Sequence, residues 1–185
     1  MNPLVGEIAE NFQLEDINGN VHQLPGKKNW SWILLHRHLG WLPCRNHVLQ
    51  LWHHRETIKR HNIQVYIVTF DQRELASEYD SESKWNWPIL LDRERKTYKK
   101  YTKGRASLAA LAGPISMFKY LNLLWKGQRL QKGGEDYFQL GGDILIDTEK
   151  TIRLHHVSQN PHDRPKVKKV LEDFCLLYTS DAADE

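Results

Sequence analysis

The sequence predicts a single α/β domain in which helices flank a mixed β-sheet. Apolar runs rich in strand-forming residues alternate along the chain with segments whose apolar residues recur at helical spacing. The 185 residues are enough to form one well-buried core, but the chain is short for two domains. Hydrophobic residues make up 40% and charged residues 26%, which excludes a disordered or collagen-like chain. Right-handed crossovers between parallel strands are expected in such a domain.

The first half of the chain contributes a hairpin, a strand and a helix. Residues 12–16 and 21–24 flank an Asn-Gly turn at residues 18–20, which predicts an N-terminal β-hairpin. The mostly apolar run at residues 30–36 predicts a strand that is buried on both faces. Apolar residues at helical spacing from Val48 onward then predict a helix that begins near Pro43 and Cys44 and continues to about His61.

Further strands and helices alternate after residue 62. Residues 63–70 predict a second buried strand, and residues 73–79 a short helix. Residues 88–92 predict a short strand, which is followed by a helical pattern over residues 93–101. The alternation favours parallel strands joined by helical crossovers.

An insert, a closing hairpin and a last helix complete the domain. The apolar helical piece at residues 115–125 is either a lid or homodimer contact, or a segment that packs on the sheet. The longest apolar stretch of the chain, residues 108–125, is interrupted by Gly113, Pro114, Lys119 and Asn122, so we expect no membrane span. Residues 142–157 predict a hairpin. An amphipathic helix is expected from four apolar residues at i, i+3, i+4 and i+7: Val167, Val170, Leu171 and Phe174.

The last eleven residues differ from the rest. Residues 175–185 resemble the translation of a transposon-type sequencing adapter, so we predict a native domain at residues 1–174 and a non-native tail at 175–185. A genuine flexible acidic tail is the alternative. Without the tail, Cys44 is the one cysteine left. It can form no intrachain disulfide, which favours a reducing compartment and a cytoplasmic protein.

Cys44 is the candidate nucleophile. It follows the first long buried strand and begins the first long helix, at the edge of the sheet where α/β active sites cluster. The N–H groups of a helix N-terminus stabilise a thiolate, and Arg37, His38 and Arg45 add positive charge. A thiolate in such a setting attacks peroxides or disulfides. The alternative is an inert, buried thiol.

Three segments in order resemble a known family. They are Val5-Gly6 with Phe12 and Leu14 at the opening, Arg37-His-Leu-Gly-Trp-Leu-Pro-Cys44-Arg45, and Gln139-Leu-Gly-Gly-Asp-Ile-Leu-Ile-Asp147. Together they are similar to the peroxiredoxin-like branch of the alkyl hydroperoxide reductase / thiol-specific antioxidant superfamily. The resemblance implies a thioredoxin-like fold, with the N-terminal hairpin and the helical insert added to it, and a thiol-dependent redox activity with Cys44 as the peroxidatic cysteine.

The chain departs from this family at the partners of the cysteine. Typical members carry P-x-x-x-T-x-x-C, and Arg37 and Trp41 stand here at the proline and threonine positions. Trp41 also stands at the first cysteine position of the C-x-x-C of thioredoxin-type members. The arginine that polarises peroxide in the family would fall near Gly141. We therefore expect Arg37 or Arg45 to support the thiolate. Trp41 and Pro43 would shape the loop, and Gly142 would allow close backbone approach.

The resulting functional prediction is a one-cysteine, peroxiredoxin-like antioxidant oxidoreductase. Cys44 would reduce a hydroperoxide, and an external thiol such as thioredoxin or glutathione would reduce Cys44, because no resolving cysteine is present. No cofactor is expected. The rival prediction is a non-catalytic binding or redox-sensor module of the same fold with an inert Cys44.

Two other classes are disfavoured. Cys44 could bind a metal together with His36, His38 or His47, but a lone thiol falls short of the usual structural zinc set, so we expect no metal. The net charge is +3, and the basic residues occur in short runs without a basic stripe that carries interleaved aromatics. This argues against nucleic acid as a partner.

Overall fold

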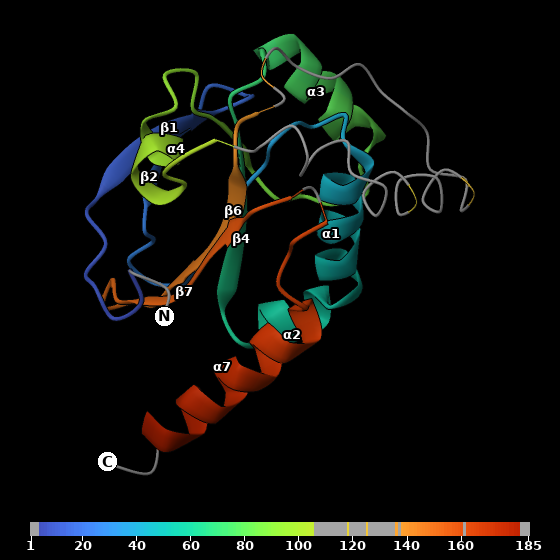
Figure 1. The fold of residues 1–185 in the computed structure, drawn as a ribbon. Helices are drawn as coiled ribbons and strands as arrows, with labels where there is room; N and C mark the ends of the chain where they lie inside the picture. Colours follow the sequence, from blue (N-terminus) through green and yellow to red (C-terminus); the bar gives the residue numbers. More distant parts are fainter. Residues whose placement is uncertain are drawn as a thin grey trace.

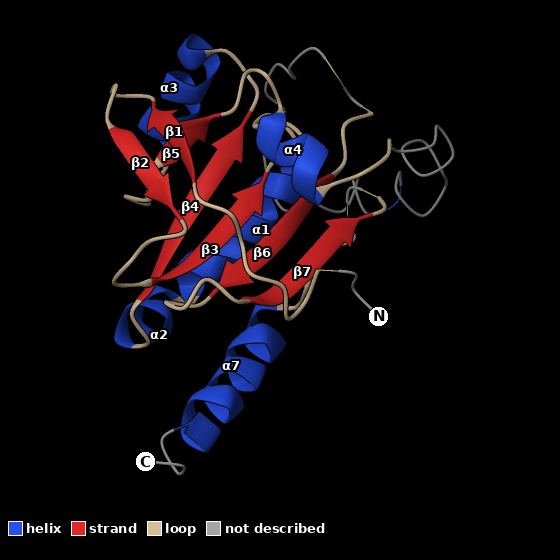
Figure 2. Cartoon of the chain, turned by 90° about the vertical axis from the view of Figure 1, so that its left-hand side faces the viewer, coloured by secondary structure: helices blue, strands red, loops and turns tan. Residues whose placement is uncertain are grey.

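A mixed sheet forms the centre of the protein (Figure 2). The computed structural model describes residues 4–105, 118, 125, 136, 138–160 and 162–181. Within these residues the sheet has seven strands in the order β2-β1-β5-β4-β3-β6-β7. In chain order they are β1 (Phe12–Asp16), β2 (Val21–Leu24), β3 (Trp30–Leu35), β4 (Ile63–Thr69), β5 (Ile89–Leu91), β6 (Gly141–Ile146) and β7 (Ile152–Ser158).

The sheet combines parallel and antiparallel pairing, as the sequence predicted. Strands β3, β4 and β5 are parallel, and their connections contain helices. The N-terminal hairpin joins through β1 antiparallel to β5, and the closing hairpin joins through β6 antiparallel to β3. Since β7 is in turn antiparallel to β6, the carboxyl ends of β3 and β7 lie at the same edge of the sheet.

Helices cover both faces of the sheet. They are α1 (Leu42–His53), α2 (Arg55–Arg60), α3 (Arg73–Glu82), α4 (Lys96–Tyr101) and α7 (Val167–Asp181). Figure 1 shows the sheet nearly edge-on, with α1 and α2 on one side and α4 on the other. The last helix, α7, runs away from the sheet at its lower end.

The central strands are buried on both faces because their side chains alternate between two cores. Trp32 and Leu34 of β3 belong to the core that also contains residues of α1, α2, α3 and α7. Ile33 and Leu35 point the other way, into the core beneath α4 and the hairpin. This period of two confirms the strand buried on both faces that the sequence predicted.

Two helices begin or end at other residues than the sequence predicted. The single helix expected up to residue 61 is two helices, because the chain breaks at His54 (φ −99°, ψ 13°). Ile58 of α2 is still buried in the core after the break. The helix expected from residue 93 begins at Lys96, since Arg95 is in the left-handed region and the Asp92 carboxylate accepts hydrogen bonds from the N–H groups of Lys96 and Thr97.

Other sequence predictions concern the insert and the C-terminal helix. The insert at residues 115–125 lies outside the described residues, except for Phe118 and Trp125, which are exposed. The four apolar residues of α7 are buried as expected, namely Val167, Val170, Leu171 and Phe174. Because α7 continues to Asp181, the domain boundary at residue 174 stays a prediction. In the described part of the chain, no helix is long and apolar enough to cross a membrane.

Candidate active site

Cys44 lies in the first turn of α1, with its side chain turned toward the sheet. Trp41 is the N-cap residue, and Pro43 occupies the first turn, where a missing N–H costs no helical hydrogen bond. Cys44, His47 and Leu51 are buried at helical spacing, so one face of α1 packs on the sheet. Cys44 is a free thiol and fully buried. The helix therefore presents its sulfur to the ends of the central strands.

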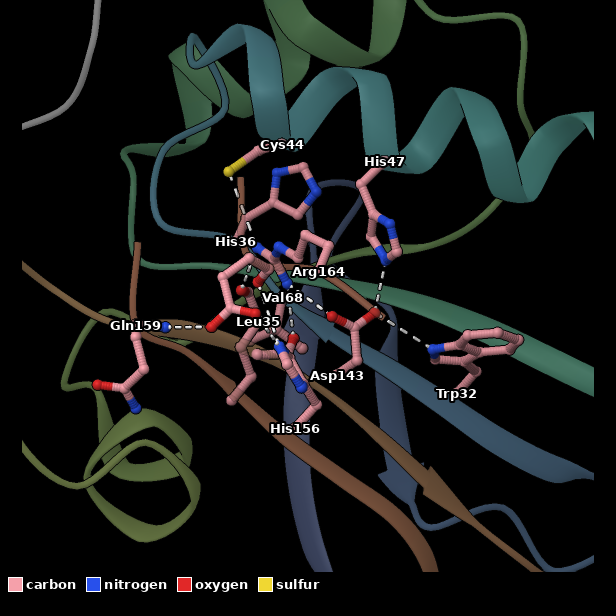
Figure 3. Close-up of polar contacts among 12 residues, drawn as sticks. Trp32, Leu35, His36, Cys44, His47, Val68, Asp143, His156, Gln159 and Arg164 are labelled. Carbon is pink, nitrogen blue, oxygen red and sulfur yellow. Dashed lines mark hydrogen bonds and ion pairs between the residues drawn. The ribbon is translucent and has the colours of Figure 1, made fainter. Parts of the chain in front are cut away.

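Arg164, in the loop between β7 and α7, contacts this sulfur. Its Nη2 lies 3.7 Å from Cys44 Sγ and also donates to the Leu35 carbonyl at 3.1 Å (Figure 3). Its Nη1 donates to the Gly142 carbonyl and to Asp143 Oδ2, both at 2.9 Å. Three oxygen acceptors thus fix the guanidinium in one orientation, facing the thiol.

Asp143 pairs with Arg164, and His47 in turn forms a hydrogen bond with Asp143. Asp143 is fully buried, and its Oδ1 accepts a hydrogen bond from His47 Nε2 at 2.6 Å and a longer one from Trp32 Nε1 at 3.4 Å. Burial alone would raise the pKa of Asp143, but His47 and Arg164 outweigh it and lower that pKa. Burial would likewise lower the pKa of Arg164, but Asp143 and Cys44 raise it. The carboxylate and the guanidinium are both charged, so a buried positive charge, paired with Asp143, lies beside the sulfur.

Arg37 is a second buried arginine near Cys44. Its Nε donates to the Gln139 carbonyl at 2.9 Å, and its guanidinium carbon lies 5.3 Å from the centre of the Trp41 ring. Burial lowers the pKa of Arg37 to about 10, and Arg164 lowers it too, whereas the interaction with Cys44 raises it. Within the described structure, Nη1 and Nη2 of Arg37 have no hydrogen-bond partner. Buried N–H donors of this kind call for a ligand or a water molecule.

His36, at the end of β3, is the remaining titratable group in the cluster. It is buried, and its two ring nitrogens have no hydrogen-bond partner in the described part of the chain. Burial, followed by the charges of Arg164 and His47, lowers the pKa of His36 to about 3. The ring is therefore neutral at physiological pH, and its centroid lies 6.2 Å from that of Tyr79.

The arginines predicted from the sequence differ in their positions. Arg37 lies in the cluster as expected. Arg45, by contrast, places its guanidinium carbon 5.5 Å from the centre of the Tyr79 ring and its Nη2 3.4 Å from Glu82 Oε2. The arginine in contact with the sulfur is Arg164, which sequence reasoning missed. No local pattern in Asp163-Arg164-Pro165 signals that this loop returns to the start of α1.

Gly141 and Gly142 allow this close packing at the start of β6. A Cβ on Gly141 would lie 2.5 Å from the Leu35 carbonyl oxygen and 2.9 Å from Arg164 Nη2. A Cβ on Gly142 would lie 2.4 Å from the His156 carbonyl oxygen. Gly141 therefore makes room for the arginine, and Gly142 makes room for the neighbouring strand β7.

The histidines considered as metal ligands have other surroundings. His47 is bonded to Asp143, and His38 Nδ1 lies 3.5 Å from Asp71 Oδ1. Across the described ranges, no three histidine, cysteine or acidic side chains form a group that could hold a metal ion.

Comparison with known protein families identifies the family of this chain. A family model described as AhpC/TSA antioxidant enzyme matches residues 50–160, more than half of the chain. The chain belongs to the AhpC/TSA family. This result confirms the resemblance that the three sequence segments indicated, to a family of thiol-dependent redox proteins with a thioredoxin-like fold. Cys44 and Arg164 both lie outside the matched segment.

Solved structures share the fold of this AhpC/TSA protein. A yeast mitochondrial 1-Cys peroxiredoxin aligns with a TM-score of 0.65 at 14% identity, over 96% of this chain and 78% of that one. AhpC from Enterococcus faecalis aligns with a TM-score of 0.64 at 13% identity, over 100% and 98%. Peroxidoxin BcpB from Mycobacterium tuberculosis aligns at 0.62 with 12% identity, over 91% and 94%. No curated protein sequence gives a significant match.

Proposed function

We propose that this AhpC/TSA protein is a one-cysteine thiol peroxidase with Cys44 as its nucleophile. The observation that carries the proposal is the 3.7 Å contact between Arg164 Nη2 and Cys44 Sγ. A fixed positive charge favours the thiolate over the thiol, and the thiolate is the form that attacks peroxide. The N-terminal turn of α1 adds N–H groups that favour the same charge.

In the proposed reaction, the Cys44 thiolate attacks the terminal oxygen of a hydroperoxide, ROOH, which is the oxygen that carries the proton. A sulfur–oxygen bond forms as the oxygen–oxygen bond breaks, and the leaving alkoxide takes up a proton to become ROH. The sulfur loses two electrons and becomes a sulfenic acid, while the peroxide gains them. Water is the product in place of an alcohol when the substrate is hydrogen peroxide.

Arg37 and Arg164 have the chemistry to stabilise this transition state. Negative charge develops on the leaving oxygen, and donors fixed in a dry site stabilise such charge more strongly than water does. Arg37 offers two buried N–H donors without a partner in the described structure, and Arg164 offers Nη2. Together they take the place of the family arginine that would fall near Gly141.

Reduction of the sulfenic acid is assigned to an external thiol. The thiol attacks the Cys44 sulfur, a mixed disulfide forms, and water leaves; a second thiol then releases reduced Cys44. The one-cysteine yeast peroxiredoxin with this fold is described as resolved by glutathione/thioredoxin systems, which supports the same class of reductant here. A cytoplasmic location and a homodimer stay predictions.

One observation favours the alternative of a non-catalytic module. Cys44 is 0% exposed, so peroxide reaches the sulfur only when the surrounding loops open. A thiol that never becomes accessible would make the protein a binding or sensor module. The buried, charged Arg164 argues against this, because an inert thiol needs no cation at its sulfur.

Turnover separates the two functions. We would measure NADPH-coupled reduction of hydrogen peroxide and of cumene hydroperoxide, with either thioredoxin or glutathione and their reductases. The wild-type chain and Cys175→Ser should turn over, and Cys44→Ser should not. Equal turnover by Cys44→Ser and the wild type would overturn the assignment of Cys44. An absence of turnover in the wild type with both reductants would favour the non-catalytic module.

A further inference from the structure

The Gln139-Leu-Gly-Gly segment at the start of β6 packs directly against Arg37. The Gln139 carbonyl accepts a hydrogen bond from Arg37 Nε at 2.9 Å. A Cβ on Gly141 would lie 2.8 Å from Arg37 Cγ, so the glycine leaves room for this side chain. Because the Nε–H lies in the plane of the guanidinium, its hydrogen bond fixes the directions of Nη1 and Nη2. The segment therefore sets the orientation of the arginine.

Arg37 has few other restraints. It is fully buried and forms no ion pair with any described residue, and its guanidinium carbon lies 5.3 Å from the centre of the Trp41 ring. Among the described residues, the Gln139 carbonyl is the only hydrogen-bond partner of its side chain. Burial lowers the pKa of Arg37, and Cys44 is the strongest influence that opposes burial, so the guanidinium and the thiol are electrostatic neighbours. The position of Arg37 beside Cys44 therefore depends on how firmly the Gln139 carbonyl is held.

Asp136 closes the turn that ends at Gln139. Its Oδ1 accepts a hydrogen bond from the N–H of Phe138 at 3.1 Å, and its carbonyl oxygen accepts one from the N–H of Gln139 at 3.4 Å. An aspartate that bonds to the backbone two residues further on is a common way to fix a turn. The Gln139 side chain is held as well, because its Nε2 donates to Thr102 Oγ1 at 3.3 Å. Side chains thus reinforce the backbone of this turn.

Two arginines in turn hold the Asp136 carboxylate. Arg95 Nη1 lies 2.5 Å from Oδ2, and Arg105 Nη2 lies 2.8 Å from Oδ1. Burial would raise the pKa of Asp136, but the hydrogen bond from Arg95 is the largest of several influences that together lower it, so the carboxylate is charged. Arg95 is the N-cap residue of α4, and Arg105 pairs with Gln139 in a β-bridge. Asp136 therefore ties the turn to the segment around α4.

We propose that Asp136 is a positioning residue for Arg37. It fixes the turn whose Gln139 carbonyl orients the Arg37 guanidinium beside Cys44. The contacts run from the two arginines near α4 through the Asp136 carboxylate to the turn, and from the turn to Arg37. The positioning of Arg37 stands on these contacts alone, whereas its effect on peroxide reduction rests on the proposed function.

NMR spectroscopy of the full, reduced, ¹⁵N-labelled chain tests this positioning without peroxide. The Arg37 Nε–H is buried and hydrogen-bonded, so it should exchange slowly with solvent, and Arg37→Lys identifies its signal by removing it. In Asp136→Ala we expect this exchange to be at least about tenfold faster, because the turn loses hydrogen bonds that fix it. Asp136→Asn keeps an acceptor for the Phe138 N–H but loses the charge, so its increase should be smaller. This second variant carries the test if Asp136→Ala does not fold.

Asp147→Ala is the matched control. Asp147 also accepts a hydrogen bond from a turn N–H, that of Thr151 at 2.7 Å, and pairs with Arg153 at 2.7 Å, but it follows the other end of β6. Its substitution should therefore lower the stability of the fold without changing the exchange of the Arg37 Nε–H. Unchanged exchange in both Asp136 variants, or an equal increase in Asp147→Ala, would overturn the proposal.

The rate at which hydrogen peroxide oxidises Cys44 tests the consequence for the proposed function. Asp136→Ala should slow the oxidation about tenfold, since a displaced group near the reacting atoms can cost that much or more. In an Arg37→Gln background the same substitution should change the rate by less than about twofold, because no guanidinium is left to position. An equal slowing in the Arg37→Gln background would show that Asp136 acts by another route and would overturn the proposal. If the exchange increases as expected but the wild type does not react with peroxide, the positioning of Arg37 stands and the peroxidase function is wrong.

Discussion

Arg164 and Cys44 are 120 residues apart in the chain, and the Nη2 of one lies 3.7 Å from the Sγ of the other. The fold brings them together because Cys44 begins the helix after β3 and Arg164 follows β7, whose carboxyl end lies at the same edge of the sheet. The arginine is held by the Leu35 and Gly142 carbonyls and by Asp143. The tertiary fold therefore produces the contact between the guanidinium and the sulfur.

Arg164→Gln should slow the oxidation of Cys44 by hydrogen peroxide about 100-fold. Removing one fixed donor from a charge-stabilising site usually costs that much or more. Arg164→Lys keeps the charge but cannot bridge the sulfur and the backbone oxygens. Its oxidation rate should therefore lie between those of the wild type and Arg164→Gln. Stopped-flow tryptophan fluorescence would give the rate constants. Arg153→Gln, which loses an ion pair to Asp147 elsewhere on β7, is the control. Equal rates for all four proteins would exclude a role for Arg164.

Asp143→Asn should destabilise the fold by about 3–5 kcal/mol. The substitution leaves the buried guanidinium of Arg164 without its counter-charge, which is the costly way to break a buried pair. Urea denaturation followed by circular dichroism gives the free energy of unfolding. Glu172→Gln, which breaks the exposed pair with Lys168, should change it by less than about 0.5 kcal/mol.

The double variant Asp143→Asn, Arg164→Gln sharpens this test. If the loss in Asp143→Asn comes from the unpaired guanidinium, removing that guanidinium should restore part of the stability. A double variant that is less stable than Asp143→Asn alone would show that the cost has another origin.

Gly141→Ala should lower both the stability and the peroxide reactivity. The new methyl group would lie 2.5 Å from the Leu35 carbonyl oxygen, which belongs to the backbone and cannot move aside, and 2.9 Å from Arg164 Nη2. Forcing a methyl group into such packing costs about 2 kcal/mol and displaces the arginine. At Gly26 the nearest atom would be 3.4 Å away, so Gly26→Ala is a control with little expected effect. Thermal unfolding and the oxidation rate are the readouts, and similar values for the two variants would contradict the packing argument.

His36→Phe should make the protein less sensitive to acid. Burial, Arg164 and His47 lower the pKa of His36 to about 3, so between pH 6.5 and 3 the unfolded chain binds a proton that the folded chain does not. As the pH decreases through this window, the free energy of unfolding therefore decreases by up to about 1.4 kcal/mol per pH unit because of this group. Between pH 6.5 and 4.5 the variant should lose about 2 kcal/mol less than the wild type. Equal losses of stability in the variant and the wild type would refute this prediction. The control is His53→Gln, at an exposed position of α1, whose stability should depend on pH as that of the wild type does.

Local patterns predicted most of the fold. The hairpin around the Asn-Gly turn, the strands buried on both faces and the apolar spacing of α7 each depend on residues close in the chain, and the structure confirms them. The single helix predicted through residue 61 was wrong, because apolar spacing does not register a break at one residue. Ile58 keeps its place in the core after the chain resets at His54.

The candidate site was predictable only in part, because its charges come from distant segments. Strand–helix position and the Arg37-to-Arg45 segment pointed to Cys44, and Arg37 lies in the cluster. Arg45, which was expected alongside Arg37 to support the thiolate, turns its guanidinium to Tyr79 and Glu82. Arg164 and Asp143 are positioned by strand register and by a loop, neither of which a single sequence displays.

The most direct test is the rate at which hydrogen peroxide converts Cys44 to sulfenic acid in the full chain. Dimedone trapping followed by peptide mass spectrometry reports Cys44 separately from Cys175. We expect Cys44 to be trapped within seconds at micromolar peroxide in the wild type, and far more slowly in Arg164→Gln. Slow trapping of Cys44 in the wild type, at a rate equal to that of Cys175 or unchanged in Arg164→Gln, would contradict the account. It would leave the AhpC/TSA fold with a buried thiol that has no peroxidase chemistry.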